Sequence, residues 1–193
     1  MARPIQFDRK DVLEKAMHAF WDQGYCATSM ASLVEITHLK PGSIYAAFDS
    51  KEGLFLAALD HYGKRSAAKI GQSLASADTP LQGVRDHFRQ MAESAADPMT
   101  KRSCLLVNTA LELGRGNPAV LQRVNHHLGV IETLFLEALE SAQATGELGE
   151  DKDPEALAAF LMASIWGLRV LGSTAPAPER TKSVVDQLLS LLD

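Results

Sequence analysis

One cysteine in the middle of the chain has neighbours that favour nucleophilic chemistry. Cys104 follows Lys-Arg-Ser at 101–103 and opens the apolar run CLLVNTALEL. If Ser103 caps a short helix over about 104–113, the thiol lies at the helix N-terminus, where the dipole and the two cations favour thiolate. If the helix begins at Pro98, that argument weakens. The alternative is a small thiol that packs in the core.

Two polar residues follow this cysteine at helical spacing. Asn108 and Glu112 lie four and eight residues after Cys104, so a helix would place all three on one face. We therefore predict that Cys104, Asn108 and Glu112 line an effector or redox-sensing cavity. The alternative is that Asn108 and Glu112 form a capping pair or lie on the surface.

The histidines do not form a pattern typical of a metal site. His126 and His127 are adjacent, so on a helix they point about 100° apart, and a pair four residues apart would suit one ion better. The sequence also lacks a Gly-rich phosphate loop, a Cys-x-x-Cys pair and a His-Glu-x-x-His motif. We predict no metal, no cofactor and no enzymatic activity.

Residues 28–51, TSMASLVEITHLKPGSIYAAFDSK, predict a helix, a tight turn and a second short helix. Thr28 is a candidate cap for the first helix, and Pro41 suits the first position of the second. Ile44 and Phe48 are four residues apart and should face the core. The opposite face would then point outward, as in a recognition helix that enters a major groove.

From this spacing we predict a DNA-binding surface. Lys51 is placed for a phosphate, Arg3 belongs to a short N-terminal arm, and Lys40 cannot cap a helix N-terminus because it has no acceptor. The predicted DNA-binding residues are Arg3, Thr28, Ser29, Lys40, Pro41, Gly42, Ser43, Tyr45, Ala46 and Lys51.

Over about the first 60 residues, the runs GY-x-ATSM-x-x-L and SIYAAF-x-SK-x-x-LF resemble the N-terminal domain of the TetR (tetracycline-repressor-like) family of bacterial transcriptional regulators. The resemblance implies a homodimeric repressor that binds double-stranded operator DNA and is released by an unidentified small-molecule effector or a redox or electrophile signal. CLLVNTALEL is similar to the segment of such regulators in which a cysteine responds to electrophiles or oxidants. The competing interpretation is a helical enzyme or carrier without DNA binding.

The overall charge argues against indiscriminate nucleic-acid binding. The 193 residues have a formal net charge of −5, and residues 1–52 hold six Lys/Arg against seven Asp/Glu. DNA binding must then depend on a few well-placed cations. Two distant cysteines and no apolar N-terminal run predict a protein of the reducing cytoplasm.

The rest of the chain has helical periodicity throughout, which predicts an all-α fold with a three-helix helix-turn-helix domain. We place that DNA-binding domain at residues 1–50 and a helical effector-binding and dimerisation domain at 51–193. Residues 156–168 carry no charge, but 13 positions are fewer than the 18 or so typical of a membrane span. This run and the apolar face over 184–192 predict a four-helix dimer interface and no membrane contact.

Overall fold

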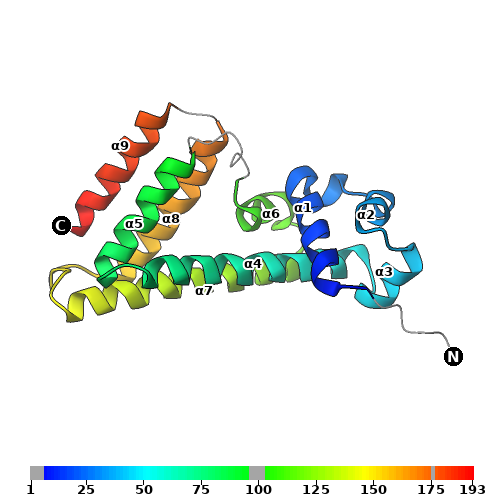
Figure 1. Cartoon of the computed structure of the whole chain (residues 1–193), viewed down its shortest axis with the longest axis horizontal. Helices are drawn as coiled ribbons and strands as arrows, with labels where there is room; N and C mark the ends of the chain where they lie inside the picture. The colour runs from blue at the N-terminus through cyan, green and yellow to red at the C-terminus, as the bar shows by residue number, and fades with distance from the viewer. Residues whose placement is uncertain (1–6, 96–102, 175–176) are drawn as a thin grey trace. The chain divides into compact units, whose positions relative to one another are not determined.

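The computed structural model describes residues 7–95, 103–174 and 177–193, which form helices and no strands (Figure 1). This confirms the predicted all-α fold. The helices are α1 (Arg9–Ala27), α2 (Met30–Thr37), α3 (Pro41–Phe48), α4 (Lys51–Ala75), α5 (Pro80–Ala95), α6 (Leu105–Leu113), α7 (Pro118–Ala144), α8 (Pro154–Ser173), α9 (Pro178–Leu189) and a final 3-10 turn, Ser190–Leu192.

The chain divides into two compact units that differ from the predicted domains. The first contains residues up to Arg65 together with 105–127, and the second contains 66–104 and 128–193. Helices α4 and α7 therefore each begin in the first unit and end in the second. The functional boundary near residue 50 stays a prediction.

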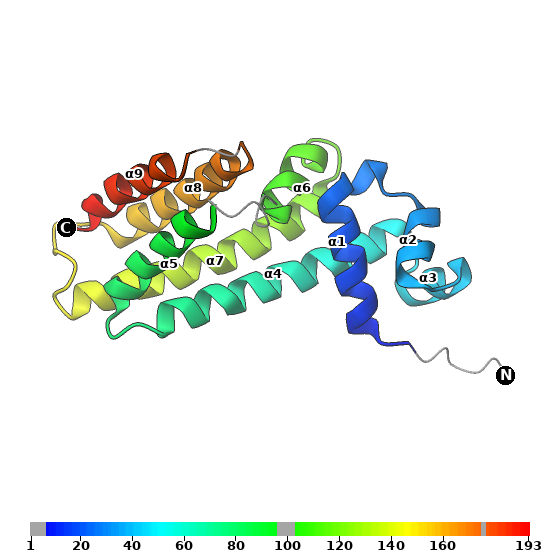
Figure 2. The same ribbon diagram turned by 45° about the horizontal axis from the view of Figure 1, so that its top comes forward.

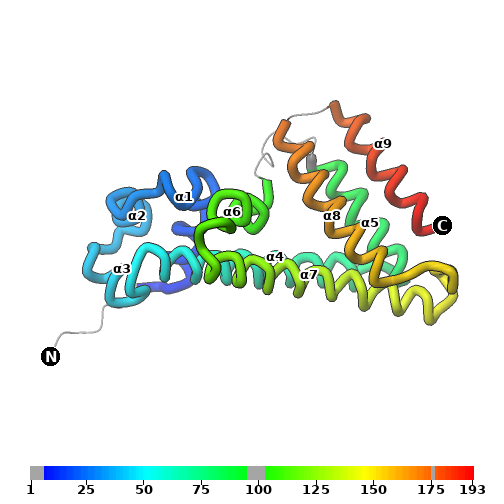
Figure 3. Tube along the Cα trace, turned by 180° about the vertical axis from the view of Figure 1, so that it is seen from behind, coloured from blue at the N-terminus to red at the C-terminus, as the bar shows by residue number. Residues whose placement is uncertain are grey.

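In the first unit, α1 packs against α2 and α6, and α2 packs against α3 (Figure 3). Phe20 of α1 and Phe55 of α4 are fully buried, and their rings meet edge to face with centroids 4.8 Å apart. Such pairs add about 0.5–1.5 kcal/mol beyond the area they bury. This aromatic contact and the buried aliphatic side chains around it hold the three N-terminal helices on the start of α4.

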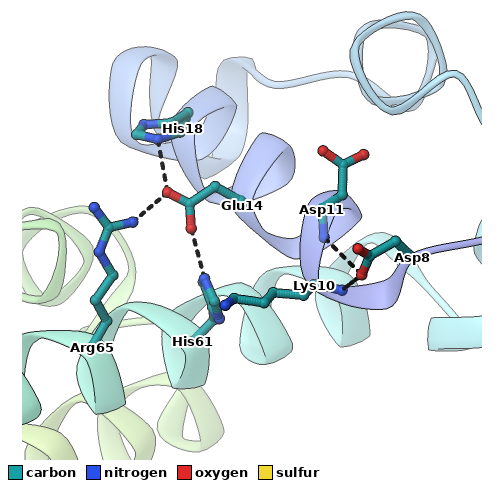
Figure 4. A network of polar contacts seen from close by, with 7 residues as sticks. All are labelled: Asp8, Lys10, Asp11, Glu14, His18, His61 and Arg65. Atoms are coloured by element: carbon teal, nitrogen blue, oxygen red, sulfur yellow. Dashed lines mark hydrogen bonds and ion pairs between the residues drawn. The ribbon is translucent and has the colours of Figure 1, made fainter.

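A charged network also joins α1 to α4 (Figure 4). His61 donates from Nε2 to one oxygen of Glu14 at 2.7 Å, while Arg65 and His18 bond the other oxygen. Burial by itself would raise the pKa of Glu14, but hydrogen bonds from His61 and Arg65 and their charges lower it to about 2. The ionised carboxylate thus stabilises the packing of α1 on α4.

The α4–α7 pair in the first unit depends on a glycine. A Cβ at Gly63 would lie 2.3 Å from the ring of His127, which is buried. His127 donates from Nε2 to Asp60 at 2.7 Å, and Arg123 bonds the other oxygen of that carboxylate. The predicted histidine pair thus separates: His127 is part of this ion-pair cluster, whereas His126 is exposed.

The second unit contains α5, α8 and α9, which lie side by side (Figure 2). Several large apolar side chains of α8, α9 and the final 3-10 turn are exposed on the single chain: Phe160, Trp166, Val170, Val184 and Leu191. By contrast, Leu188 is 5% exposed because it packs within its own chain. A dimer interface over 184–192 would therefore use the outer residues of that segment.

Helix α8 is longer than the 13-residue charge-free run on which the prediction of no membrane contact was based. Its 20 residues are enough, by length and composition alone, to cross a membrane. The 13-residue charge-free run is shorter than the apolar length of this helix, because the helical residues on either side of the run add few charges. A core helix of a globular protein passes the same test.

We expect Glu14→Gln to lower the free energy of unfolding at pH 7 by about 1–2 kcal/mol. The folded-state pKa lies below the ordinary value of 4.5, so this stabilisation is complete above pH 4.5 and is lost as the pH falls toward 2. The estimate is below what the shift alone implies, because a third of the side chain is exposed to solvent.

Urea unfolding of the wild type and variant between pH 7 and pH 3 measures this difference. The two stabilities should converge as the pH falls, and a difference that is independent of pH would contradict the assignment. Asp11→Asn, which removes an exposed pair with Lys15, is the matched control and should change stability by less than about 0.5 kcal/mol.

Candidate nucleic-acid interface

Helix α2 begins one residue later than its sequence suggests. Ser29 is the N-cap, and its hydroxyl accepts from the Ser32 N–H at 3.0 Å. The prediction that Thr28 caps this helix was wrong. Thr28 is 0% exposed, and its hydroxyl donates to the Gly24 carbonyl at 2.6 Å, closing the end of α1 instead.

The turn between α2 and α3 is built from unusual backbone and a proline. His38 ends α2 in the left-handed region, with φ 58° and ψ 21°. Lys40 is the N-cap of α3 and makes no side-chain cap bond, as its lack of an acceptor requires, and Pro41 follows at the first helical position. The N-terminus of α3 therefore carries no side-chain cap.

The faces of α3 are largely those predicted. Ile44 and Phe48 are buried, while Pro41, Gly42, Tyr45 and Ala46 are exposed, with Tyr45 at 48%. The expectation that Ser43 faces outward was wrong, because it is 6% exposed beside Ile44. The exposed surface of α3 thus consists of a proline, small residues and one tyrosine.

Two cations make ring contacts at the C-terminal end of α3. The Arg9 guanidinium lies 4.4 Å from the centre of the Phe48 ring and donates to the Ala47 carbonyl at 3.2 Å. Just beyond α3, the Lys51 ammonium lies 4.3 Å from the centre of the Tyr25 ring. These contacts fix α3 against α1 and place Lys51 at its C-terminal end.

A carboxylate from α6 holds the bend that leads into α2. Gly24 has φ 81° and ψ 168°, a conformation open essentially to glycine, and the chain resumes its helix after it. The Tyr25 and Cys26 N–H groups then donate to the two oxygens of Glu112 at 3.0 and 2.8 Å. A Cβ at Gly24 would lie 3.0 Å from the same carboxylate.

Sequence reasoning missed this contact, since it expected Glu112 in an effector or redox-sensing cavity. The sequence signal was Gly24 itself, directly before a further helical turn. Burial alone would raise the pKa of Glu112, but hydrogen bonds from Cys26 and Tyr25 and the Lys51 charge lower it. Glu112 is thus ionised and bonded to the backbone.

The two cysteines have different surroundings. Cys104 is half-buried and directly precedes α6, which begins at Leu105, one residue later than the predicted Ser103 cap requires, while Lys101 and Arg102 lie outside the described residues. Cys26 is exposed, and its hydrogen bond to Glu112 raises the pKa of its thiol, so Cys26 is a thiol at neutral pH. Arg3 of the predicted interface also lies outside the described residues.

The second unit holds a cavity of about 230 Å³ between α4, α5 and α8. Its walls combine basic, hydroxyl, amide and apolar side chains. None of the predicted effector residues Cys104, Asn108 and Glu112 lines it. The lining residues are Ser66, Lys69, Ile70, Ser73, His87, Gln90, Met91, Ser94, Ile165 and Arg169.

Comparisons with known proteins cover both units. Residues 12–58 match the family described as bacterial regulatory proteins, tetR family, and residues 80–185 match the tetracyclin repressor-like C-terminal domain. The chain is 33% identical over 190 residues to the HTH-type transcriptional repressor ComR of Escherichia coli (strain K12), covering 98% of this chain and 90% of ComR. It is 29% identical to the uncharacterized HTH-type transcriptional regulator YezE of Bacillus subtilis (strain 168), over the full length of both.

A solved structure resembles the whole chain at similar identity. A cysteine mutant of the TetR-family transcriptional regulator CifR, complexed with 26-bp double-strand operator DNA, superposes with a TM-score of 0.87. It is 34% identical and covers 99% of this chain and 100% of CifR. The helix-turn-helix, the helical second unit and these matches agree, and the chain belongs to the TetR family of bacterial transcriptional regulators, not to a class of enzymes.

Proposed function

We propose that this protein is a homodimeric repressor that binds a double-stranded DNA operator through α3 and leaves it when a small molecule binds the second unit. The observation that carries the proposal is the exposed face of α3, which ends in a half-exposed tyrosine and is flanked by Lys40 and Lys51. CifR, which is 34% identical over the chain, was solved with operator DNA.

The proposed contacts divide into base-reading and phosphate-binding groups. Tyr45 offers a ring and a hydroxyl to base edges, and the small residues Gly42 and Ala46 beside it allow close approach to the groove. Lys40 and Lys51 suit phosphates of the DNA backbone. Ser29 lies at the exposed N-terminus of α2, which also favours a phosphate. Buried Thr28 and Ser43 support this surface from behind.

A dimer is needed because an operator presents two half-sites. The recognition helices of helix-turn-helix dimers lie about 34–36 Å apart, one turn of DNA. The exposed apolar side chains of α8 and α9 supply a surface for the partner, and a groove of about 580 Å³ runs between Phe160, Leu171 and Val184. An exposed apolar patch of this kind is typical of a subunit interface.

The effector is proposed to bind the cavity between α4, α5 and α8. Of the described residues, those that line it come from three helices of one unit, and they combine apolar and polar groups as ligand sites do. Covalent sensing by Cys104 stays a prediction, since Cys104 lies directly before α6 and its two cationic neighbours are outside the described residues.

Tyr45→Ala should weaken operator binding by tenfold or more, since the loss of one good base contact is worth about 1–3 kcal/mol. The measurement is a mobility shift with DNA from upstream of the protein's own gene. Tyr45→Phe removes only the hydroxyl and keeps the ring, so it separates the contributions of the two groups to operator affinity. Unchanged affinity in Tyr45→Ala, with melting like that of the wild type, would rule out this contact.

Val184→Asp should dissociate the dimer, because a buried, unpaired charge costs several kcal/mol. The matched control is Val130→Asp on α7, since Val130 is 40% exposed and Val184 is 42% exposed. Sedimentation at micromolar concentration should give monomer for the first and dimer for the second. If Val184→Asp sediments as a wild-type dimer, the interface lies elsewhere.

A further inference from the structure

The charged side chains that line the cavity between α4, α5 and α8 are all cationic. Among its described lining residues, Lys69 of α4 and Arg169 of α8 are cationic and none is acidic. No carboxylate of the described residues lies within ion-pair distance of Lys69 or Arg169. Other cavities that have cationic lining residues are also lined by acidic residues.

His87 adds a neutral polar group to the same lining. Burial, followed by the charges of Arg169 and Lys69, lowers the pKa of His87 to about 4, so the ring is uncharged at pH 7. Its Nδ1 lies 3.4 Å from the Ser73 hydroxyl, and its ring packs edge-on against Phe135 with centroids 5.6 Å apart. A neutral imidazole has one N–H to donate and is held in position here.

Part of the lining is apolar, and the volume is small. Met91 and Ile165 are buried and Ile70 is half-buried. With about 30 Å³ for each water-sized group, 230 Å³ has room for about eight non-hydrogen atoms. This is below the roughly 300–1,000 Å³ of sites for drug-sized ligands. The ligand should then be small, with both a charged and an apolar part.

We propose that this cavity binds a small aliphatic carboxylate, with its charged group at Arg169 and Lys69 and its chain against Met91 and Ile165. The inference rests on the proposed function, because it names the chemical class of the effector. The Arg169 guanidinium suits a carboxylate through paired hydrogen bonds, and Lys69 adds a point charge. Gln90 and Ser73 supply further hydrogen-bonding groups.

The apolar wall separates this ligand class from inorganic anions. A phosphate would meet the same cations, but it has no apolar part to bury against the apolar side chains, whereas each methylene of an aliphatic carboxylate would be buried there. An amine of the same length would meet two positive charges. The order of affinity should therefore be carboxylate first, then phosphate and the neutral amide, with the amine last.

Isothermal titration calorimetry on the full-length protein, without DNA and at constant ionic strength, tests this order. The probes are butyrate, butyramide, butylamine and inorganic phosphate, where the first three share one chain and differ in charge. Butyrate should bind at least tenfold more tightly than butyramide. Arg169→Gln and Lys69→Gln should each weaken butyrate at least tenfold, while Arg180→Gln, an exposed cation on α9 outside the lining, should not.

Several results would overturn the proposal. If butyramide binds as tightly as butyrate, the negative charge of the ligand does not contribute to affinity. If phosphate binds as tightly as butyrate, the apolar wall does not contribute. Butyrate affinity unchanged in both cavity variants would place the anion elsewhere. Butyrate binding is measured without DNA, so it tests the cavity proposal alone. The regulatory proposal fails separately if an operator complex survives saturating butyrate.

Discussion

The first unit depends on two hydrogen bonds between a side chain of α6 and the backbone of α1. Glu112 accepts from the Tyr25 and Cys26 N–H groups, which the unusual backbone at Gly24 has freed from their helical partners. The chain then continues to Thr28, whose buried hydroxyl closes α1, and to the Ser29 cap of α2. The start of the helix-turn-helix is thus fixed by a residue more than eighty positions away.

The helices could be predicted from the sequence because their ends carry local signals. Prolines at 41, 80, 118, 154 and 178 each begin a helix, and Asp153 accepts from the N–H groups that α8 leaves free. The inward face of α3 followed from the spacing of Ile44 and Phe48. In all these cases the cause lies within a few residues of its effect.

The errors concern effects that depend on distant residues. Thr28 and Ser29 are both good caps in sequence, and only the packing of Thr28 on Gly24 decides between them. Glu112 shares a helix face with Cys104 and Asn108, yet its carboxylate is bound by α1. The cavity lined by Lys69, His87 and Arg169 joins three helices, so no stretch of sequence contains it.

The continuity of α4 relates the proposed DNA-binding and ligand-binding surfaces. The same helix carries Lys51 beside α3, His61 and Arg65 in the network with Glu14, and Lys69 at the cavity. A ligand that displaces α4 at Lys69 would act on a helix that also holds α1 in place. Release of DNA needs such a ligand to bind the free form more tightly than the bound form.

The most direct test of this account is the operator affinity of Glu112→Ala, measured by fluorescence anisotropy on DNA from upstream of the protein's own gene. The substitution leaves two N–H groups without their acceptor, and because its removal of a negative charge near Lys51 would by itself favour phosphate binding, weaker binding would report the lost hydrogen bonds. The account predicts binding weakened roughly tenfold in a protein that is still a dimer, as expected for loss of about 1–2 kcal/mol of charged hydrogen bonding. Wild-type affinity in this variant would contradict the claim that Glu112 fixes the helix-turn-helix.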